Sequence, residues 1–184
     1  GGGGFLLARA QDSNPVLYDF FAQTPRHKQP ADSIDFYPIS ADFGTARQEF
    51  HIGYGAAATP GTVHGLFSIH EALCRLPMQV LMAPAIELAR RGVAINALQA
   101  YILDVVKPIY QATPEAAAQF GSDRNTDQLV GLGETLYLPQ LAETLDALSP
   151  EGVRLFYEGE IAAAIAAARR DRRPLDRPDL AAYR

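Results

Sequence analysis

The feature that most constrains the fold is a series of helical apolar patterns after residue 59. Apolar residues recur near helical spacing from Val63 to Cys74, ahead of Pro77. Further helical stretches are expected at about 83–92, 96–110, 114–120, 139–148 and, rich in alanine, 149–170. Lys107 and Pro108 should kink or end the 96–110 stretch. The chain is therefore expected to be mostly helical after residue 59.

Residues that commonly start and stop helices sharpen two of these boundaries. Thr59 is a candidate N-cap, with Pro60 at the first helical position. The next helix is expected to begin near Pro84 and to stop at Gly92, with arginines in its last turn. The polar, glycine-containing stretch 121–133 is typical of a loop.

The N-terminal part has a different pattern. Short apolar runs at 5–10 and 16–21 flank a turn cluster at 11–15, which predicts a β-hairpin. Residues 24–58 contain prolines, glycines and aromatics without sustained periodicity, so we expect an ordered but irregular connection that packs onto other elements.

Composition excludes several classes of protein. With 184 residues, 48% hydrophobic and 20% charged, the chain is typical of one globular domain. Its net charge of -5 argues against a nucleic-acid partner. The basic cluster 169–177 is interrupted by Asp171 and Asp176, so it is expected to be a solvated helix end. No apolar run approaches the roughly 18 residues of a membrane span, so no membrane partner is expected.

The sequence predicts neither a metal site nor a cofactor. His64 and His70 would lie about 240° apart around one helix, too far round to share an ion. Cys74 is expected to be a buried structural thiol that could touch His70. The glycine run 1–4 lacks the Gly-Lys-Ser/Thr context of a phosphate loop and is expected to give close backbone approach instead. The Gly-x-Gly-x-x-Ala segment at 53–58 likewise lacks the strand and helix of a dinucleotide site.

Several segments, taken together and in their order along the chain, resemble a known protein family, although no single segment is specific to it. They are Gly-Gly-Gly-Gly-Phe at 1–5, the stretch 17–25, Thr-Pro-Gly-Thr-Val-His-Gly at 59–65, Leu-Pro at 76–77, Pro-Ala-Ile-Glu-Leu-Ala-Arg-Arg-Gly at 84–92, Gly-Glu-Thr-Leu at 133–136, Leu-Ala-Glu-Thr-Leu at 141–145, Phe-Tyr-Glu-Gly-Glu-Ile-Ala at 156–162 and Asp-Leu-Ala-Ala-Tyr at 179–183. This ordered set resembles the large subunit of the γ-glutamyltranspeptidase family of N-terminal-nucleophile hydrolases.

The resemblance implies an α+β fold that forms part of a four-layer αββα sandwich. Residues 1–184 would be a single incomplete domain, a large-subunit portion without an N-terminal segment and without the small subunit. The catalytic threonine would be freed by autocleavage at the start of that small subunit, so no catalytic residue is assigned within this chain. Alone, the chain is expected to be inactive, to expose apolar surface and to self-associate.

The same resemblance places the substrate wall at Phe21, Gln23 and Arg26. The family has an arginine at position 21 that clamps the α-carboxylate of a γ-glutamyl group, and Phe21 cannot make that charge-assisted contact. Either Arg26 or Lys28 approaches the carboxylate instead, or the pocket has become more apolar and accepts another acyl amide. The expected substrate is therefore a small γ-glutamyl or related acyl amide.

Two further questions stay open at this point. The alternative function is a noncatalytic structural or binding relative that keeps the fold, and the sequence beyond Arg184 would separate it from an enzyme. The resemblance implies a periplasmic or extracellular location, while a cytoplasmic one is compatible with a sequence that shows no signal peptide.

Overall fold

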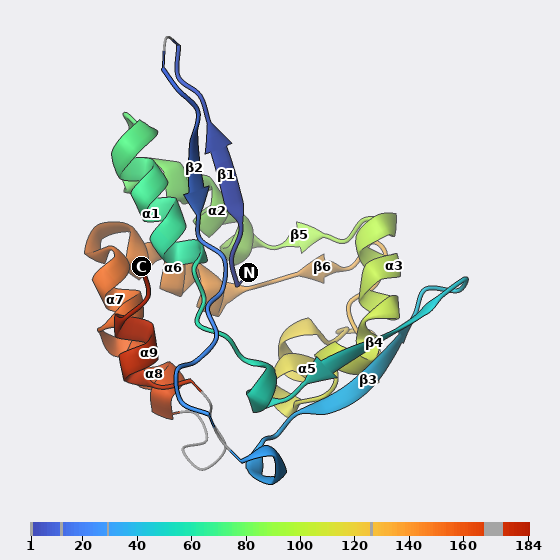
Figure 1. Cartoon of the computed structure of the whole chain (residues 1–184). Coiled ribbons are helices and arrows are strands. Elements are labelled where there is room, and N and C mark those ends of the chain that lie inside the picture. Colours follow the sequence, from blue (N-terminus) through green and yellow to red (C-terminus); the bar gives the residue numbers. More distant parts are fainter. Residues whose placement is uncertain (1, 12, 29, 126, 168–174) are drawn as a thin grey trace. The chain divides into compact units, whose positions relative to one another are not determined.

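The computed structural model describes residues 2–11, 13–28, 30–125, 127–167 and 175–184. The chain has a mixed α+β fold that is mostly helical and carries small hairpins (Figure 1). It divides into two compact units, each built from separate stretches of sequence. The first unit comprises residues 1–35, 53–81 and 147–184, and the second comprises residues 36–52 and 82–146.

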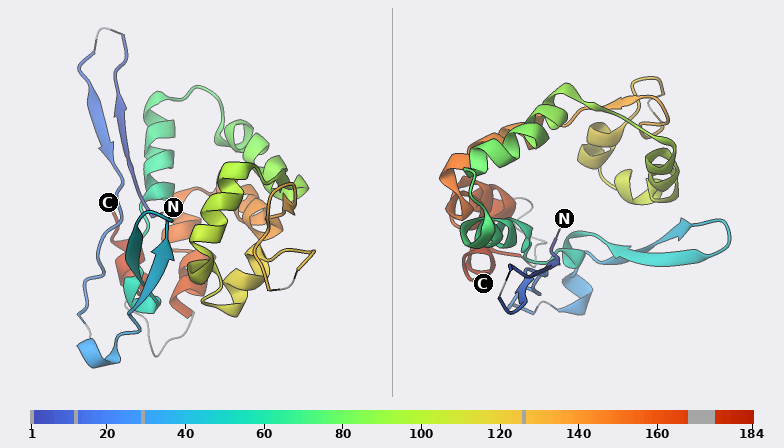
Figure 2. Two further views of the ribbon diagram at one scale, coloured as in Figure 1. Left: turned by 90° about the vertical axis from the view of Figure 1, so that its right-hand side faces the viewer. Right: turned by 90° about the horizontal axis from the view of Figure 1, so that it is seen from above.

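The first unit contains one hairpin and a set of helices. β1 (Phe5–Ala8) pairs antiparallel with β2 (Val16–Asp19), with Phe5 opposite Asp19. The helices are α1 (Thr62–Leu73), α7 (Val153–Tyr157), α8 (Glu160–Ala167) and α9 (Arg177–Ala181), with short 3-10 turns η1 (Ala31–Ser33) and η2 (Tyr54–Ala56). The hairpin runs beside α1, and its tip extends past the end of that helix (Figures 1 and 2).

The second unit contains one further hairpin, a short pair of strands distant in sequence, and short helices. β3 (Tyr37–Asp42) pairs with β4 (Arg47–Ile52), and β5 (Val93–Ala94) pairs with β6 (Thr135–Leu136). The helices are α3 (Ala97–Val105), α4 (Lys107–Tyr110) and α5 (Pro114–Phe120). Two longer helices, α2 (Met78–Arg91) and α6 (Pro139–Glu151), have residues in both units.

Each unit has its own buried cluster. In the first unit Tyr157, Leu180 and Tyr183 pack with Ala162 and Leu175. In the second unit Ile86, Ala89 and Ala142 pack where α2 meets α6. Alanine at these helix positions lets the helix backbones approach closely.

The structure confirms the hairpin at the N-terminus and the helical character after residue 59. The break at Lys107 and Pro108 is also confirmed, because α3 ends at Val105 and α4 begins at Lys107. A side chain on Gly3 would lie 2.5 Å from the nitrogen of Ala22, so the glycine run does allow a close backbone approach.

The prediction of an irregular connection at 24–58 is wrong for residues 37–52, which form the β3–β4 hairpin. Pro38 lowers the strand signal of this stretch, but a two-stranded ribbon tolerates it because each strand has a free edge. β5 and β6 were also not predicted, since two residues are too few to show alternation.

Three helix boundaries differ from those predicted. Thr59 does not cap α1, because its backbone pairs with Gln23 and the helix starts three residues later behind Gly61. α2 begins at Met78, well before Pro84, which lies inside it. The expected helix over 149–170 is interrupted at Gly152, whose φ of 72° suits glycine, and again at Gly159.

Cys74 is exposed, so the prediction of a buried thiol is wrong. It lies just after α1, where His70 bonds the Leu76 carbonyl oxygen at 2.8 Å through its Nε2 atom.

The basic cluster 169–177 was predicted to be a solvated helix end. Most of it, residues 169–174, lies outside the described residues.

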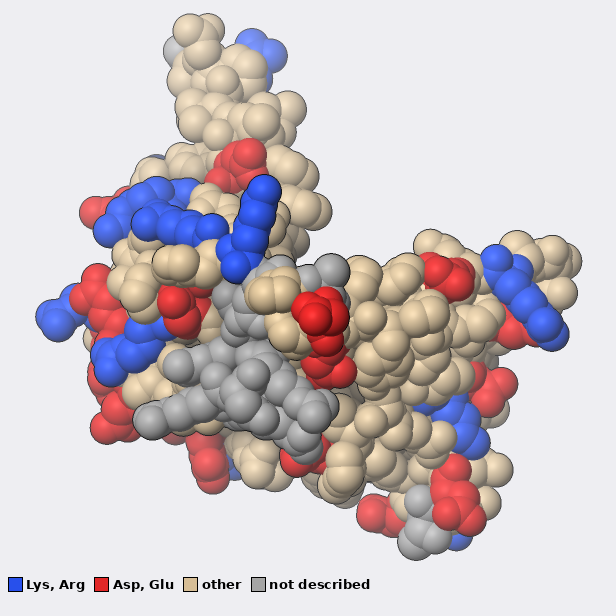
Figure 3. Space-filling model, turned by 60° about the horizontal axis from the view of Figure 1, so that its bottom comes forward, with Lys and Arg blue, Asp and Glu red and all other residues tan. Residues whose placement is uncertain are grey.

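None of the helices among the described residues combines the length and the apolar character that a membrane crossing requires. On the face seen in Figure 3, the side chains of Lys and Arg are interspersed with those of Asp and Glu.

Candidate functional site

The three residues predicted to form the substrate wall lie on the segment 20–26, which leaves β2 in the first unit. We call this segment the wall. Its start is tied to the glycine run, because the Phe20 N–H donates to the Gly4 carbonyl at 3.0 Å. Its middle is tied to Thr59, which exchanges two backbone hydrogen bonds with Gln23. Thr59 is only 2% exposed, so this pairing is shielded from water.

Phe20 and the helix α1 fit together because of a glycine. The Phe20 side chain lies directly against Gly65 of α1. A Cβ added to Gly65 would overlap the Cβ and Cγ atoms of Phe20. Packing of this kind fixes where the wall leaves the hairpin.

Phe21 presents an aromatic surface to solvent. Its side chain is 58% exposed and stacks on Phe5, with ring centroids 5.5 Å apart. Its backbone N–H donates to the Asp19 carboxylate at 3.0 Å, a local turn that continues from β2. The position at which the resemblance predicts the family's arginine therefore carries an exposed apolar ring.

Gln23 and Arg26 are both exposed and both contact the C-terminal stretch 179–184. The Gln23 side-chain amide donates to the Arg184 carbonyl at 3.0 Å. The Arg26 contact is made by its backbone N–H, which donates to Asp179 at 2.9 Å. Lys28 is also exposed.

A cluster of aromatic and histidine side chains lies beneath the wall, and the sequence did not reveal it. Tyr183 and Tyr157 stack with ring centroids 5.6 Å apart, and His64 packs edge-on against both rings. The Tyr183 hydroxyl donates to the Phe21 carbonyl at 2.8 Å. Tyr157 donates to the Pro60 carbonyl at 2.7 Å and accepts from the His64 N–H at 3.1 Å.

Burial controls the ionisation of this cluster. It raises the pKa of Tyr157 to about 12 and also raises the pKa of Tyr183, to which the negative charge of Asp19 adds. Burial lowers the pKa of His64, and the positive charge of Arg184 lowers it further. All three groups are therefore held in their neutral forms near neutral pH.

His27, Asp176 and Asp179 bring possible metal-ligating atoms within 4.8 Å of one another. The two carboxylates, however, already form a capping box for the five-residue helix α9, in which each accepts a backbone N–H from the other's residue. Asp179 also accepts the N–H of Arg26. We therefore assign Asp176 and Asp179 to capping α9, and Asp179 also to holding the wall.

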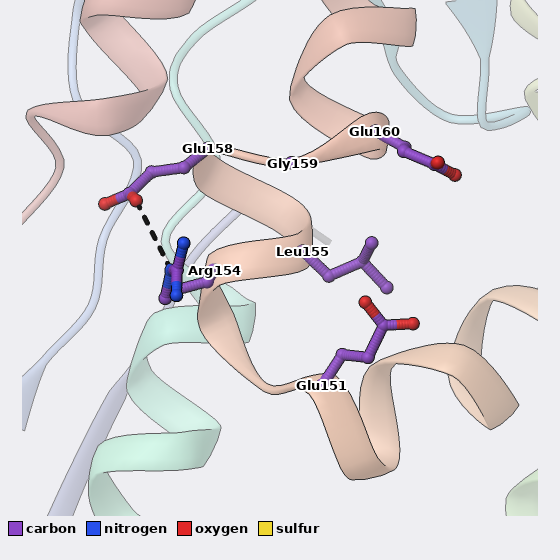
Figure 4. A pocket seen from close by; sticks show the side chains of 6 residues that line it. All are labelled: Glu151, Arg154, Leu155, Glu158, Gly159 and Glu160. Carbon is purple, nitrogen blue, oxygen red and sulfur yellow. Dashed lines mark ion pairs between the residues drawn. The ribbon is translucent and has the colours of Figure 1, made fainter.

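A hollow of about 530 Å³ lies elsewhere in the first unit, where α6, α7 and α8 meet (Figure 4). Glu151, Glu158 and Glu160 line it together with Arg154, which pairs with Glu158 at 3.6 Å. The three glutamates are exposed, and exposed carboxylates of this kind are typical of a solvated helix surface. None of the predicted wall residues lines this hollow.

The wall presents two kinds of exposed surface, the stacked Phe5–Phe21 rings and the polar side chains of Gln23 and Arg26. It cannot supply an N-terminal nucleophile, because the only threonine in it, Thr24, has no free α-amine. The residues that sequence reasoning missed are Tyr183, Tyr157, His64 and Asp179. Asp179 and Tyr183 stand in a segment that carried the family resemblance, but nothing in the sequence showed that they contact a stretch more than 150 residues away.

Comparisons with known proteins give a consistent picture. The family model described as Gamma-glutamyltranspeptidase matches residues 1–184. The chain is 29% identical over 189 residues to a protein named Glutathione hydrolase proenzyme from Pseudomonas aeruginosa, with 100% of this chain and 31% of that protein covered. It is 32% identical over 166 residues to the Capsule biosynthesis protein CapD proenzyme of Bacillus anthracis, with 90% of this chain and 26% of that protein covered.

The fold agrees with these sequence matches. The crystal structure of Helicobacter pylori gamma-Glutamyltranspeptidase superposes with a TM-score of 0.83 at 25% identity, covering 100% of this chain and 51% of that one. The chain thus spans about half of that solved chain and less than a third of the two curated relatives. On a match that runs over all of its residues, this chain belongs to the gamma-glutamyltranspeptidase family.

Proposed function

We propose that residues 1–184 are the large-subunit portion of an amide hydrolase or acyltransferase that cleaves γ-glutamyl or related acyl amides. The observation that carries this proposal is the family match over the whole chain. It is supported by the name of the Pseudomonas aeruginosa relative, a glutathione hydrolase. The chain alone would be inactive, because the nucleophile belongs to a small subunit outside these residues.

The reaction would use a threonine at the start of that small subunit. Its hydroxyl oxygen attacks the amide carbonyl while its own α-amine takes the hydroxyl proton. The C–N bond then breaks, the amine product leaves with that proton, and the acyl group stays on the threonine as an ester. Water or the amino group of an acceptor attacks the ester and releases the acyl group. The proenzyme names of both curated relatives support a cleavage step that exposes such a threonine.

The hairpin β1–β2 would form part of the central sheets of an αββα sandwich completed by residues outside 1–184. Large apolar side chains on the hairpin are exposed, including Leu7 at 70% and Leu17 at 60%. An isolated two-stranded ribbon is marginally stable in water, and apolar surface of this kind is normally covered. This exposure supports both the proposed sandwich and the self-association expected of the isolated chain.

Within this enzyme, the wall would contact the acyl group of the substrate. Phe21 offers an apolar ring where an arginine would bind an α-carboxylate, which favours an acyl group that lacks this carboxylate. The exposed Arg26 is the alternative ligand for a γ-glutamyl carboxylate.

Autoprocessing is tested by incubating the full-length protein and separating the products on a denaturing gel. We expect two bands whose molecular masses add up to that of the precursor. A variant in which the threonine at the junction is replaced by alanine should give only the precursor band. A precursor that stays intact under all conditions would favour the noncatalytic relative.

The acyl specificity is tested on the processed enzyme with a γ-glutamyl anilide and an acyl anilide that lacks the α-amino and α-carboxyl groups. We expect preference for the second substrate. Phe21→Arg should shift preference toward the γ-glutamyl compound, whereas Phe21→Leu, which adds no charge, should not. A wild-type preference for the γ-glutamyl compound that Arg26→Ala abolishes would instead assign the carboxylate to Arg26.

A further inference from the structure

The wall is joined to the C-terminal stretch 179–184 by three hydrogen bonds that span more than 150 residues of sequence. The Tyr183 hydroxyl donates to the Phe21 carbonyl, the Gln23 amide donates to the Arg184 carbonyl, and the Arg26 N–H donates to Asp179. The first of these comes from a side chain that is 2% exposed, whereas Gln23 and Arg184 are exposed. Asp179 is 4% exposed, so the bonds made by Tyr183 and Asp179 are better protected from competition with water than the bond between Gln23 and Arg184.

The position of the Tyr183 hydroxyl is fixed from several sides. Its ring stacks on Tyr157 and meets the edge of His64. The absence of a side chain on Gly61 leaves the space that the hydroxyl occupies, since a Cβ there would overlap it. The side chain is thus ordered by the core before it reaches the wall, and its hydrogen bond costs little additional entropy.

The hydrogen bond to the Phe21 carbonyl restrains the part of the wall that lies between two backbone anchors. Phe20 is anchored to Gly4 on one side and Gln23 to Thr59 on the other, both through backbone bonds. Between these anchors, among the described residues, neither Phe21 nor Ala22 makes a backbone–backbone hydrogen bond. The backbone angles of Phe21, which set the direction of its side chain, are therefore held by side chains that bond its N–H and its carbonyl. The Tyr183 hydroxyl holds the Phe21 carbonyl at 2.8 Å.

We propose that Tyr183 is a positioning residue for the substrate: by holding the Phe21 carbonyl, its hydroxyl fixes the direction in which the wall presents the Phe21 side chain to the acyl group. This inference rests on the proposed function, in which the wall contacts that group. Tyr183 itself does not touch the reacting atoms, and its effect passes through the backbone of the wall.

The test compares Tyr183→Phe with Tyr157→Phe in the full-length, processed enzyme. Each change removes one hydroxyl from the same stacked pair, but the Tyr157 hydroxyl bonds Pro60 and does not reach the wall. We expect Tyr183→Phe to raise KM for the acyl anilide about two- to tenfold, the range that a lost neutral hydrogen bond gives, with kcat within about twofold. Tyr157→Phe should leave KM within about twofold. Amide hydrogen exchange of residues 21–26 should rise in Tyr183→Phe only.

Equal KM values for the two variants would overturn the proposal, as would a raised KM in Tyr183→Phe with unchanged exchange at 21–26. If the wild-type enzyme turns over neither anilide, the proposed function fails. Exchange then decides alone, because faster exchange at 21–26 in Tyr183→Phe but not in Tyr157→Phe supports the positioning role, and equal exchange rejects it.

Discussion

The wall of the first unit and the loop before β6 in the second unit are both irregular segments whose backbone is held by side chains, and the main side chain differs in charge between the two. At Phe21 the wall is held by the neutral hydroxyl of Tyr183, while the carboxylate of Asp179 holds it at Arg26. The loop is held by the carboxylate of Glu134, which accepts the Ser122 hydroxyl at 2.6 Å and the Gly131 N–H at 2.7 Å. Arg124 lies 3.9 Å from the same carboxylate.

This difference determines how each segment should respond to pH. The bond from Ser122, followed by that from Gly131, lowers the pKa of Glu134, so the loop is held most firmly when the carboxylate is charged. Beneath the wall, burial raises the pKa of both tyrosines and lowers that of His64, so the cluster is most stable when it carries no charge.

The largest effect is expected from Gly61→Ala, which breaks the hold on the wall. A Cβ at this position would overlap the Tyr183 hydroxyl and the Phe20 carbonyl, and the backbone carbonyl cannot rotate away as a flexible side chain could. We expect a loss of about 1–3 kcal/mol of unfolding free energy, typical of overpacking. Denaturant unfolding of the full-length protein measures it.

Gly2→Ala is the matched control for this change. Its new Cβ would lie 3.6 Å from the Ala22 Cβ, an ordinary contact, so its effect should stay within about 0.5 kcal/mol. Similar losses for the two variants would show that the space around the Tyr183 hydroxyl does not limit stability.

A smaller and more local effect is expected from Glu134→Ala in the second unit. It removes the acceptor for Ser122 and Gly131, so amide exchange of residues 122–125 and 127–131 should rise while that of the wall stays unchanged. Glu134→Gln keeps one acceptor oxygen and should fall between wild type and alanine. If amide exchange in the wall also became faster, the contacts that hold the wall and those that hold the loop would not be independent.

As pH falls, the cluster beneath the wall and the loop before β6 should lose stability in two successive pH ranges. Because the pKa of His64 is lower in the folded state than its ordinary 6.5, the stability that its neutral form contributes is full above pH 6.5 and is lost as pH falls below that value. The contribution of Glu134 is present above its ordinary 4.5 and is lost only as pH falls through its lower folded pKa. Exchange measured over a pH series should therefore rise first around Tyr183 and later in the loop.

His64→Gln tests the first of these windows. Without the imidazole, stability should no longer fall as pH drops from 6.5 toward the start of the Glu134 window. A decline of unchanged size in this variant would assign the first window to another group.

Sequence reasoning predicted a substrate wall at Phe21, Gln23 and Arg26 but did not predict the contacts that hold this segment. The turn cluster at 11–15 and the helical spacing after residue 59 are local signals, and the hairpin and helices they predict are present. Thr59 shows where local signals fail, because its pairing with Gln23 overrides its tendency to cap a helix. The positions of Tyr183, His64 and Asp179 depend on contacts across most of the chain, which no spacing rule could reveal.

The smallest effect is expected from Arg124→Gln, which asks whether the loop is held by hydrogen bonds or by charge pairing. The Arg124 side chain is 70% exposed and stands 3.9 Å from Glu134, and exposed ion pairs contribute little to stability. We expect a slight rise in the pKa of Glu134, followed by NMR titration of its carboxyl group, and exchange in the loop close to that of wild type. The bonds from Ser122 and Gly131 lower this pKa more than Arg124 does, so they should dominate. If Arg124→Gln raises amide exchange in the loop as much as Glu134→Ala does, the ion pair with Arg124 holds the loop. The loop would then differ from the wall by being held through charge pairing instead of through hydrogen bonds.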